Sequence, residues 1–178
     1  MGAAWEDVAP GAEPSAPAAP GDLLACHGTA FLDRLIATGE RLHGAGEYAY
    51  ATHIVCVADG HYVEALANGV DRTPLDWYQP SGYRLIRTGL DPADAARAVA
   101  FWESCVGDGY GYVTDVGLGL TCLSGLPWGV IRRGAYICSG LAAMGLFHAG
   151  VNFGPRAAPQ LMMPSGVMRF YEVPPVGR

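Results

Sequence analysis

The chain has 178 residues, of which 51% are hydrophobic and 16% charged, so it can build a core and is not a disordered chain. The formal net charge is −6, and all eleven basic residues are arginine. This composition excludes chemistry that needs a lysine, and it disfavours nucleic acid as a partner because phosphate contacts rely on basic residues.

Five cysteines at wide spacings, with no C-x-x-C pair, indicate neither a disulfide scaffold nor a structural zinc site. We expect no cofactor and no metal. The first basic residue is Arg34, so no secretory signal with a basic n-region is expected, and a cytoplasmic or virion-associated location is favoured. The uncharged stretch 134–155 could span a bilayer, but its five glycines favour a buried helix over a stable membrane span.

Residues 1–20 contain seven alanines and four prolines, which predicts a flexible N-terminal tail ahead of a single folded domain over 21–178. Apolar spacing predicts a helix over 30–42. Asp59-Gly60 lies between the β-favouring runs 50–57 and 61–66, which predicts a hairpin with a type I′ turn.

A further strand is predicted over 84–87. Asp91 and Pro92 are typical of a helix N-terminus, and the helix that follows should bury the side chains of Ala95, Ala98, Val99, Trp102, Cys105 and Val106. Residues 107–129 are predicted to be irregular, 138–148 helical and 160–173 partly a strand. Helices and strands mix without βαβ alternation, so the predicted class is α+β.

The hairpin places a histidine beside a carboxylate. With a two-residue loop, paired positions add up to 119, so Glu64 is the diagonal neighbour of His53 on one face of the sheet. A carboxylate so placed can fix the imidazole tautomer and stabilise its charged form. Alone, His53 is better interpreted as a satisfied half-buried polar group and Glu64 as a solvated strand residue. Their position on one face of the sheet makes a functional pair an equally good interpretation.

Cys138 lies where a loop enters a helix. The unpaired amides and the helix dipole there favour a thiolate, and they can also stabilise an oxyanion. With His53 and Glu64, it would complete a set of nucleophile, base and orienting group. The alternative is that Cys138 is a small buried hydrophobic residue.

Other chemistry-bearing clusters are weaker. Cys26 and His27 are neighbours in a predicted strand, so their side chains point to opposite faces and cannot easily share a proton. The remaining histidines show no metal-ligand spacing. Three tryptophans are expected in the core or a pocket wall, namely Trp77, Trp102 and Trp128.

Two motifs resemble those of a known family. The C-S-G-L sequence at Cys138 resembles the helix start of the NlpC-type cell-wall peptidases, and the G-D-G-Y sequence ending at Tyr110 resembles their G-x-x-Y element. Because His53 and Glu64 precede the cysteine, the order resembles the circularly permuted, YiiX-like hydrolases, which begin with a Gly-Asp strand such as Gly21-Asp22.

This resemblance covers about residues 21–167. It implies a circularly permuted papain-like fold, in which a central antiparallel sheet packs against helices. It also implies that Cys138 is the nucleophile, His53 the base, Glu64 the orienting residue and Tyr110 an active-site tyrosine, with Tyr112 as the fallback.

The implied function is a cysteine hydrolase (amidase or peptidase) or an acyltransferase. Its substrate would be a peptide, a peptidoglycan peptide, an isopeptide or an N-acyl amide. Gly111 stands where the family often has an acidic residue, and loop 113–133 is unusually apolar, so the substrate contacts stay open.

Two other functions are compatible with the sequence. One is a catalytically silent structural or virion-associated module of the same fold, joined to a larger assembly through the N-terminal tail. The other is a lipid- or acyl-chain-binding protein, suggested by the apolar loop 117–131. The sequence leaves the substrate and the oligomeric state open.

Overall fold

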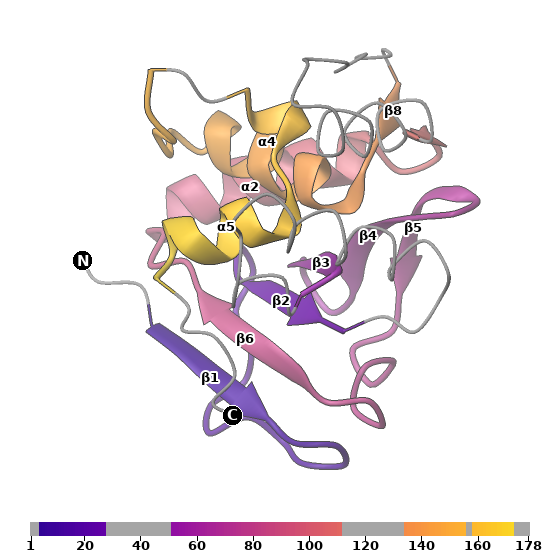
Figure 1. Cartoon of the computed structure of the whole chain (residues 1–178), viewed down its shortest axis with the longest axis vertical. Coiled ribbons are helices and arrows are strands. Elements are labelled where there is room, and N and C mark those ends of the chain that lie inside the picture. Colours follow the sequence, from indigo (N-terminus) through magenta and orange to yellow (C-terminus); the bar gives the residue numbers. More distant parts are fainter. Residues whose placement is uncertain (1–3, 28–50, 112–133, 156–157, 173–178) are drawn as a thin grey trace, which may run out of the picture.

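The computed structural model describes residues 4–27, 51–111, 134–155 and 158–172. Within these ranges, six strands form one antiparallel sheet of order β1-β6-β2-β3-β4-β5 (Figure 1). Its strands are β1 (Ala4–Val8), β2 (Leu23–Cys26), β3 (His53–Val57), β4 (Tyr62–Leu66), β5 (Gly69–Thr73) and β6 (Tyr83–Arg87).

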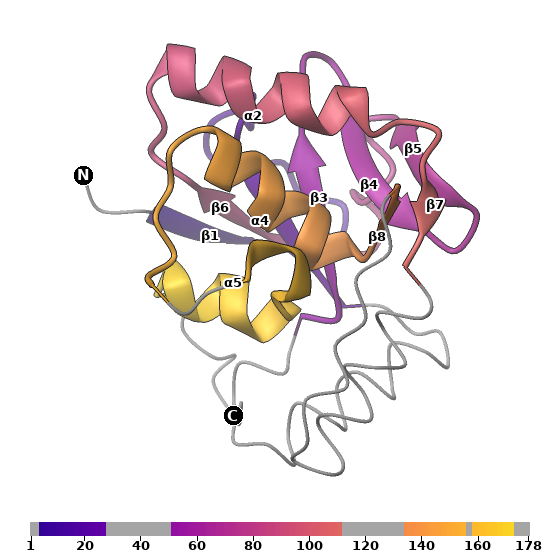
Figure 2. The same cartoon turned by 90° about the horizontal axis from the view of Figure 1, so that it is seen from above.

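Three α-helices lie against one face of this sheet in the described part of the chain (Figure 2). They are α2 (Pro92–Ser104), α4 (Cys138–His148) and α5 (Pro164–Phe170). The short elements are the parallel pair β7 (Gly109–Tyr110) and β8 (Ala135–Tyr136), and the 3-10 helix η2 (Pro159–Leu161). The predicted α+β class and the antiparallel sheet against helices are confirmed.

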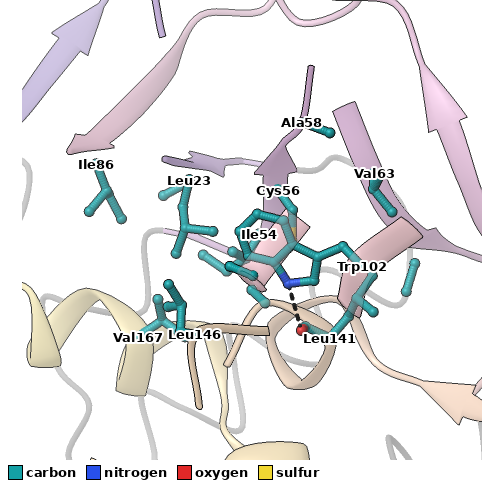
Figure 3. Packing of buried hydrophobic residues seen from close by; sticks show 14 of the residues in the cluster. Leu23, Ile54, Cys56, Ala58, Val63, Ile86, Trp102, Leu141, Leu146 and Val167 are labelled. Carbon is teal, nitrogen blue, oxygen red and sulfur yellow. Dashed lines mark hydrogen bonds between the residues drawn. The ribbon is translucent and has the colours of Figure 1, made fainter. Parts of the chain in front are cut away.

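The main core fills the space between the sheet and the helices. Trp102 of α2 is fully buried there, and its Nε1 donates a hydrogen bond to the carbonyl oxygen of Leu141 at 3.1 Å (Figure 3). That bond satisfies the polar atom of a large apolar side chain and so offsets the cost of removing the indole N–H from water. Trp102 thereby joins α2 to α4, the helix that begins at Cys138.

The opposite face of the sheet is also buried. Val55, Val57 and Tyr62 form a second cluster there, and Ala12 and Ala18 from the N-terminal segment pack against it. Alternate residues of β3 and β4 therefore contribute to two different cores, as the period of two requires.

The predicted hairpin register is confirmed, because Cys56 pairs with Val63 and Val57 with Tyr62, each adding up to 119. The predicted type I′ turn is wrong. That turn needs positive φ at both central residues. Gly60 has a φ of 77°, but Glu172 is the only non-glycine residue with positive φ in the described ranges, so Asp59 does not adopt it.

Both predicted helices flanking the main core are confirmed. The Asp91 side chain caps α2 by accepting a hydrogen bond from the backbone N–H of Asp94 at 2.8 Å. Helix α4 is buried on nearly all sides, which explains its apolar composition. Its small residues permit this: a Cβ on Gly140 would lie 2.6 Å from the carbonyl oxygen of Gln160.

The expectation of a flexible tail over 1–20 is wrong for the residues that the structure describes. Residues 4–8 form edge strand β1 along β6. Glu6 accepts hydrogen bonds from the backbone N–H and the hydroxyl of Ser15, and Arg87 donates to the carbonyl oxygens of Ala16 and Pro17. The segment is ordered because it covers the second apolar face of the sheet.

The predicted final strand over 160–173 is also wrong, since η2 and α5 occupy these residues. Pro164 begins α5, and Val167, Met168 and Tyr171 are buried at helical spacing. Trp102 is in the core as expected, whereas 62% of Trp77 is exposed.

Several predictions lie outside the described residues, namely the helix over 30–42, Tyr112, Trp128 and the whole apolar loop 113–133. No helix within the described ranges combines the length and apolarity needed to cross a membrane.

Candidate active site

Cys138 is the first residue of α4. Its predecessor Ile137 has extended backbone angles and provides no side-chain cap, so the first amides of the helix have no side-chain acceptor there. The thiol Sγ lies 4.0 Å from the carbonyl oxygen of Thr52, the residue before β3. Only 4% of Cys138 is exposed. The helix start and the strand start therefore meet at this sulfur.

His53 opens β3 and contacts two groups. Its Nε2 lies 2.6 Å from Oε2 of Glu64, and its ring also makes a side-chain hydrogen bond with Cys138. With Nε2 held by the carboxylate, Nδ1 is the ring nitrogen left to interact with the thiol. The imidazole thus lies between the cysteine and the glutamate, with 17% of its side chain exposed.

Glu64 of β4 is fully buried and lies on the sheet face away from the helices. Its Oε1 accepts a hydrogen bond from Thr73 Oγ1 at 2.5 Å, and its Oε2 accepts one from the hydroxyl of Tyr78. Burial opposes the ionisation of Glu64. The hydrogen bond and the charge of His53, together with the hydrogen bonds from Thr73 and Tyr78, outweigh it and hold the pKa of Glu64 below its usual range. A buried carboxylate is maintained here by three donors.

Burial also opposes the charged form of His53. The charge of Cys138 and the hydrogen bonds with Cys138 and Glu64 outweigh it and raise the pKa of His53 to about 10. The site therefore favours a protonated imidazole between two acidic groups.

No protein-family model matches this chain, and no curated protein does either. The chemistry of these residues therefore has to be inferred from their arrangement. Three groups that are far apart in the sequence meet in an order of thiol, imidazole and carboxylate, which is the order that activates a cysteine nucleophile.

The structure brings Cys138, His53 and Glu64 together, as the hairpin geometry and the helix start predicted. Tyr110 lies on β7, which pairs with β8 just before α4, and it packs against the main core. A role for Tyr110 in the reaction stays a prediction. The tyrosine whose hydroxyl bonds Glu64 is Tyr78.

Sequence reasoning missed two members of the site. The position of Thr73 could have been predicted from the turn between β4 and β5. A two-residue loop after Leu66 pairs Tyr62 with Thr73, which puts Thr73 on the same face of the sheet as Glu64. The Asn68-Gly69 pair signals a turn in this stretch, but taken as the two loop residues it would predict pairs that add up to 137 instead of the observed 135. Tyr78 lies in an irregular loop, where residue spacing says nothing about the direction of a side chain.

Within the described ranges, no group of three or more acidic, histidine or cysteine side chains could hold a metal ion. Cys26 is buried in the second core, and burial raises the pKa of its thiol. That environment keeps Cys26 in its inert, neutral form.

The free energy of unfolding should depend on pH through this pair. A raised histidine pKa adds stability that is complete below 6.5 and is lost as the pH rises through about 10. The lowered pKa of Glu64 adds stability above 4.5 that is lost as the pH falls through the folded value.

We expect the free energies of unfolding of the wild type and of His53→Gln, measured by urea denaturation, to differ most at pH 6.5 or below and to converge toward pH 10. A gap that stays constant over this range would contradict the raised pKa.

Proposed function

We propose that the protein is a cysteine hydrolase or acyltransferase that acts on amide or ester bonds. The observation that carries this proposal is the position of the His53 ring, which is hydrogen-bonded to Cys138 on one side and to the buried carboxylate of Glu64 on the other. Burying a carboxylate is costly unless it is paired and hydrogen-bonded, and the contact with the His53 ring is one of the bonds that keep Glu64 charged.

In the first step, Nδ1 of His53 holds the proton of the Cys138 thiol, and Sγ attacks the acyl carbon of the substrate. The carbonyl π electrons move onto oxygen, where the backbone amides at the start of α4 can stabilise the charge. The intermediate then collapses, the bond from carbon to the amine or alcohol breaks, and the imidazolium gives its proton to that leaving group. A thioester on Cys138 remains.

In the second step, His53 takes a proton from water or from another acceptor, which attacks the thioester. The C–S bond breaks, and the sulfur leaves as a thiolate that again pairs with the protonated imidazole. Glu64 keeps the ring in the tautomer that presents Nδ1 to the sulfur in both steps. Water as acceptor makes the protein a hydrolase, and an amine or alcohol makes it a transferase.

We further propose the circularly permuted papain-like fold. The chain order supports it, since the histidine strand β3 and the glutamate strand β4 come before the cysteine helix α4. The resemblance favours peptide, peptidoglycan-peptide, isopeptide or N-acyl amide substrates.

A catalytically silent module of the same fold is the second candidate. The exposed fraction of Cys138, only 4%, favours it, because a nucleophile has to reach its substrate. The two functions differ in one measurable property, which is the formation of a covalent acyl group on the sulfur.

The deciding experiment uses p-nitrophenyl acetate as a probe. We expect a burst of nitrophenolate and an acetyl group on Cys138 in the peptide mass spectrum, both lost in Cys138→Ala. Burial raises the pKa of the thiols of Cys56 and Cys105, so they should stay unmodified. A Cys122→Ser background removes the thiol that lies outside the described residues. Acetylation that persists without His53 would favour the silent module.

A further inference from the structure

The loop between β5 and β6, residues 74–82, carries a tyrosine into the site. Tyr78 donates its hydroxyl hydrogen to Oε2 of Glu64, the same oxygen that meets Nε2 of His53. The rings of Tyr78 and His53 have centroids 6.3 Å apart and are tilted by 32°. Burial and the charge of Glu64 raise the pKa of Tyr78, so the phenol remains a donor.

Loop 74–82 is itself anchored to the sheet. The hydroxyl of Tyr62 donates to the carbonyl oxygen of Leu75 at 2.9 Å, and the rings of Tyr62 and Tyr78 have centroids 6.0 Å apart. Within the loop, Trp77 N–H bonds the carbonyl of Pro74, and Ser81 N–H bonds the carbonyl of Tyr78. The position of Tyr78 is therefore fixed by bonds at both ends of the turn.

The N-terminal segment holds the same loop from the other side. The backbone N–H of Gly11 donates to the carbonyl oxygen of Gln79 at 2.8 Å. Gly82 has a φ of +69°, and a Cβ at this position would lie 2.9 Å from both the carbonyl oxygen of Val8 and Cδ of Pro10. The two segments are in direct backbone contact, and only a glycine permits this spacing.

We propose that Tyr78 is a positioning residue for the His53–Glu64 pair and that loop 74–82, held by the N-terminal segment, keeps it in place. A carboxylate can rotate about its last torsion angle. Donors on both oxygens, Thr73 on Oε1 and Tyr78 on Oε2, stop that rotation, and the fixed Oε2 in turn fixes the imidazole. Nδ1 then stays directed at the sulfur of Cys138.

The first test is Tyr78→Phe, which removes only the hydroxyl. Assuming the proposed function, we expect acylation of Cys138 by p-nitrophenyl acetate to slow by about tenfold or more, because a hydrogen bond to a charged group is lost. Independently of any activity, we expect the NMR shifts of the imidazole nitrogens of isotope-labelled His53 to change and its N–H to exchange faster with water. The matched control is Tyr171→Phe, since the buried Tyr171 hydroxyl has no hydrogen-bond partner among the described residues.

The second test measures how the contact with the N-terminal segment affects His53 while the hydroxyl of Tyr78 is still present. Gly82→Ala should push β1 and its following turn away from the loop and move the His53 shifts in the same direction as Tyr78→Phe. Gly89→Ala is the control, because Gly89 has a similar φ of +71° and nothing within 4 Å of an added Cβ. It introduces the backbone strain without the displacement, and it should leave His53 unchanged.

The outcomes distinguish this inference from the proposed function. Unchanged His53 shifts and unchanged acylation in Tyr78→Phe overturn the positioning role, although the cysteine chemistry would stand. If the wild type acylates no probe while His53 responds to Tyr78→Phe and not to Tyr171→Phe, the positioning role stands and the proposed function fails. If Tyr78→Phe does not fold, Tyr62→Phe removes the anchor at Leu75 and gives the same two readouts.

Discussion

His53→Ala is expected to slow acylation of Cys138 by about a thousandfold, the scale of a lost general base. The imidazole is the one group in hydrogen-bond contact with both Cys138 and Glu64, so nothing else in the described site can hold the thiol proton. The burst of nitrophenolate measures the loss. Circular dichroism should show a native fold, because His53 lies at the start of β3 and not inside either core.

His53→Gln is the matched variant. Its amide can still donate to Glu64, so the buried carboxylate keeps three donors, yet it cannot accept a proton from sulfur. We expect the same loss of acylation as in His53→Ala with a smaller loss of stability. Acylation at the wild-type rate in either variant would contradict the role of His53 as the base.

Glu64→Gln should have a milder effect than either histidine variant. A glutamine can keep its carbonyl oxygen toward His53 and Tyr78, while its amino group donates to Thr73 Oγ1, so every polar atom remains bonded. The variant removes charge and keeps geometry, and it therefore isolates the electrostatic contribution to the imidazolium. If Glu64→Gln slowed acylation as much as His53→Ala does, Glu64 would act mainly through its negative charge and not by setting the tautomer of His53.

Gly145→Ala is expected to destabilise the protein by about 3 kcal/mol or more, at the upper end of what overpacking costs. An added Cβ at this position would lie 2.0 Å from Nε1 of Trp102. The indole cannot move aside, because it is fully buried and bonded to Leu141 (Figure 3). The helices α2 and α4 would have to separate. Urea denaturation monitored by Trp fluorescence measures the change.

Gly166→Ala provides the comparison for Gly145→Ala. It also adds a methyl group inside a helix, but its nearest neighbour is the flexible side chain of Met162, 3.1 Å away. We expect a change within about 1 kcal/mol, because the better helix propensity of alanine offsets the contact. Equal destabilisation by the two substitutions would show that the Trp102 contact is not what limits the packing of α4.

The parts of the site that follow from short-range rules could be predicted from the sequence. The register of the hairpin depends only on the length of the Asp59-Gly60 loop and the period of a strand, so it placed His53 beside Glu64. The start of α4 at Cys138 follows from local composition. Neither rule requires knowledge of the tertiary structure.

The remaining parts depend on contacts that no local pattern encodes. Residues 1–20 have the composition of a linker, yet the segment that the structure describes is ordered, because the second face of the sheet offers it an apolar surface. Residues 160–173 contain apolar residues compatible with a strand or a helix, and packing under α4 selects the helix α5. Tyr78 reaches Glu64 from a loop whose course is set by its anchors.

Sequence separation divides the site into two halves that form in different ways. Glu64 is 11 residues from His53, 9 from Thr73 and 14 from Tyr78, whereas Cys138 is 86 residues from its contact at Thr52. The entropy lost on closing a chain segment grows with the length of the segment. Bringing Glu64 to His53 therefore costs less chain entropy than bringing the sulfur of Cys138 to the same place. Substitutions that disrupt β3, β4 or β5 would therefore separate His53 from Glu64. Substitutions that disrupt the packing of the helices would leave that pair in place and move the sulfur of Cys138 away from His53.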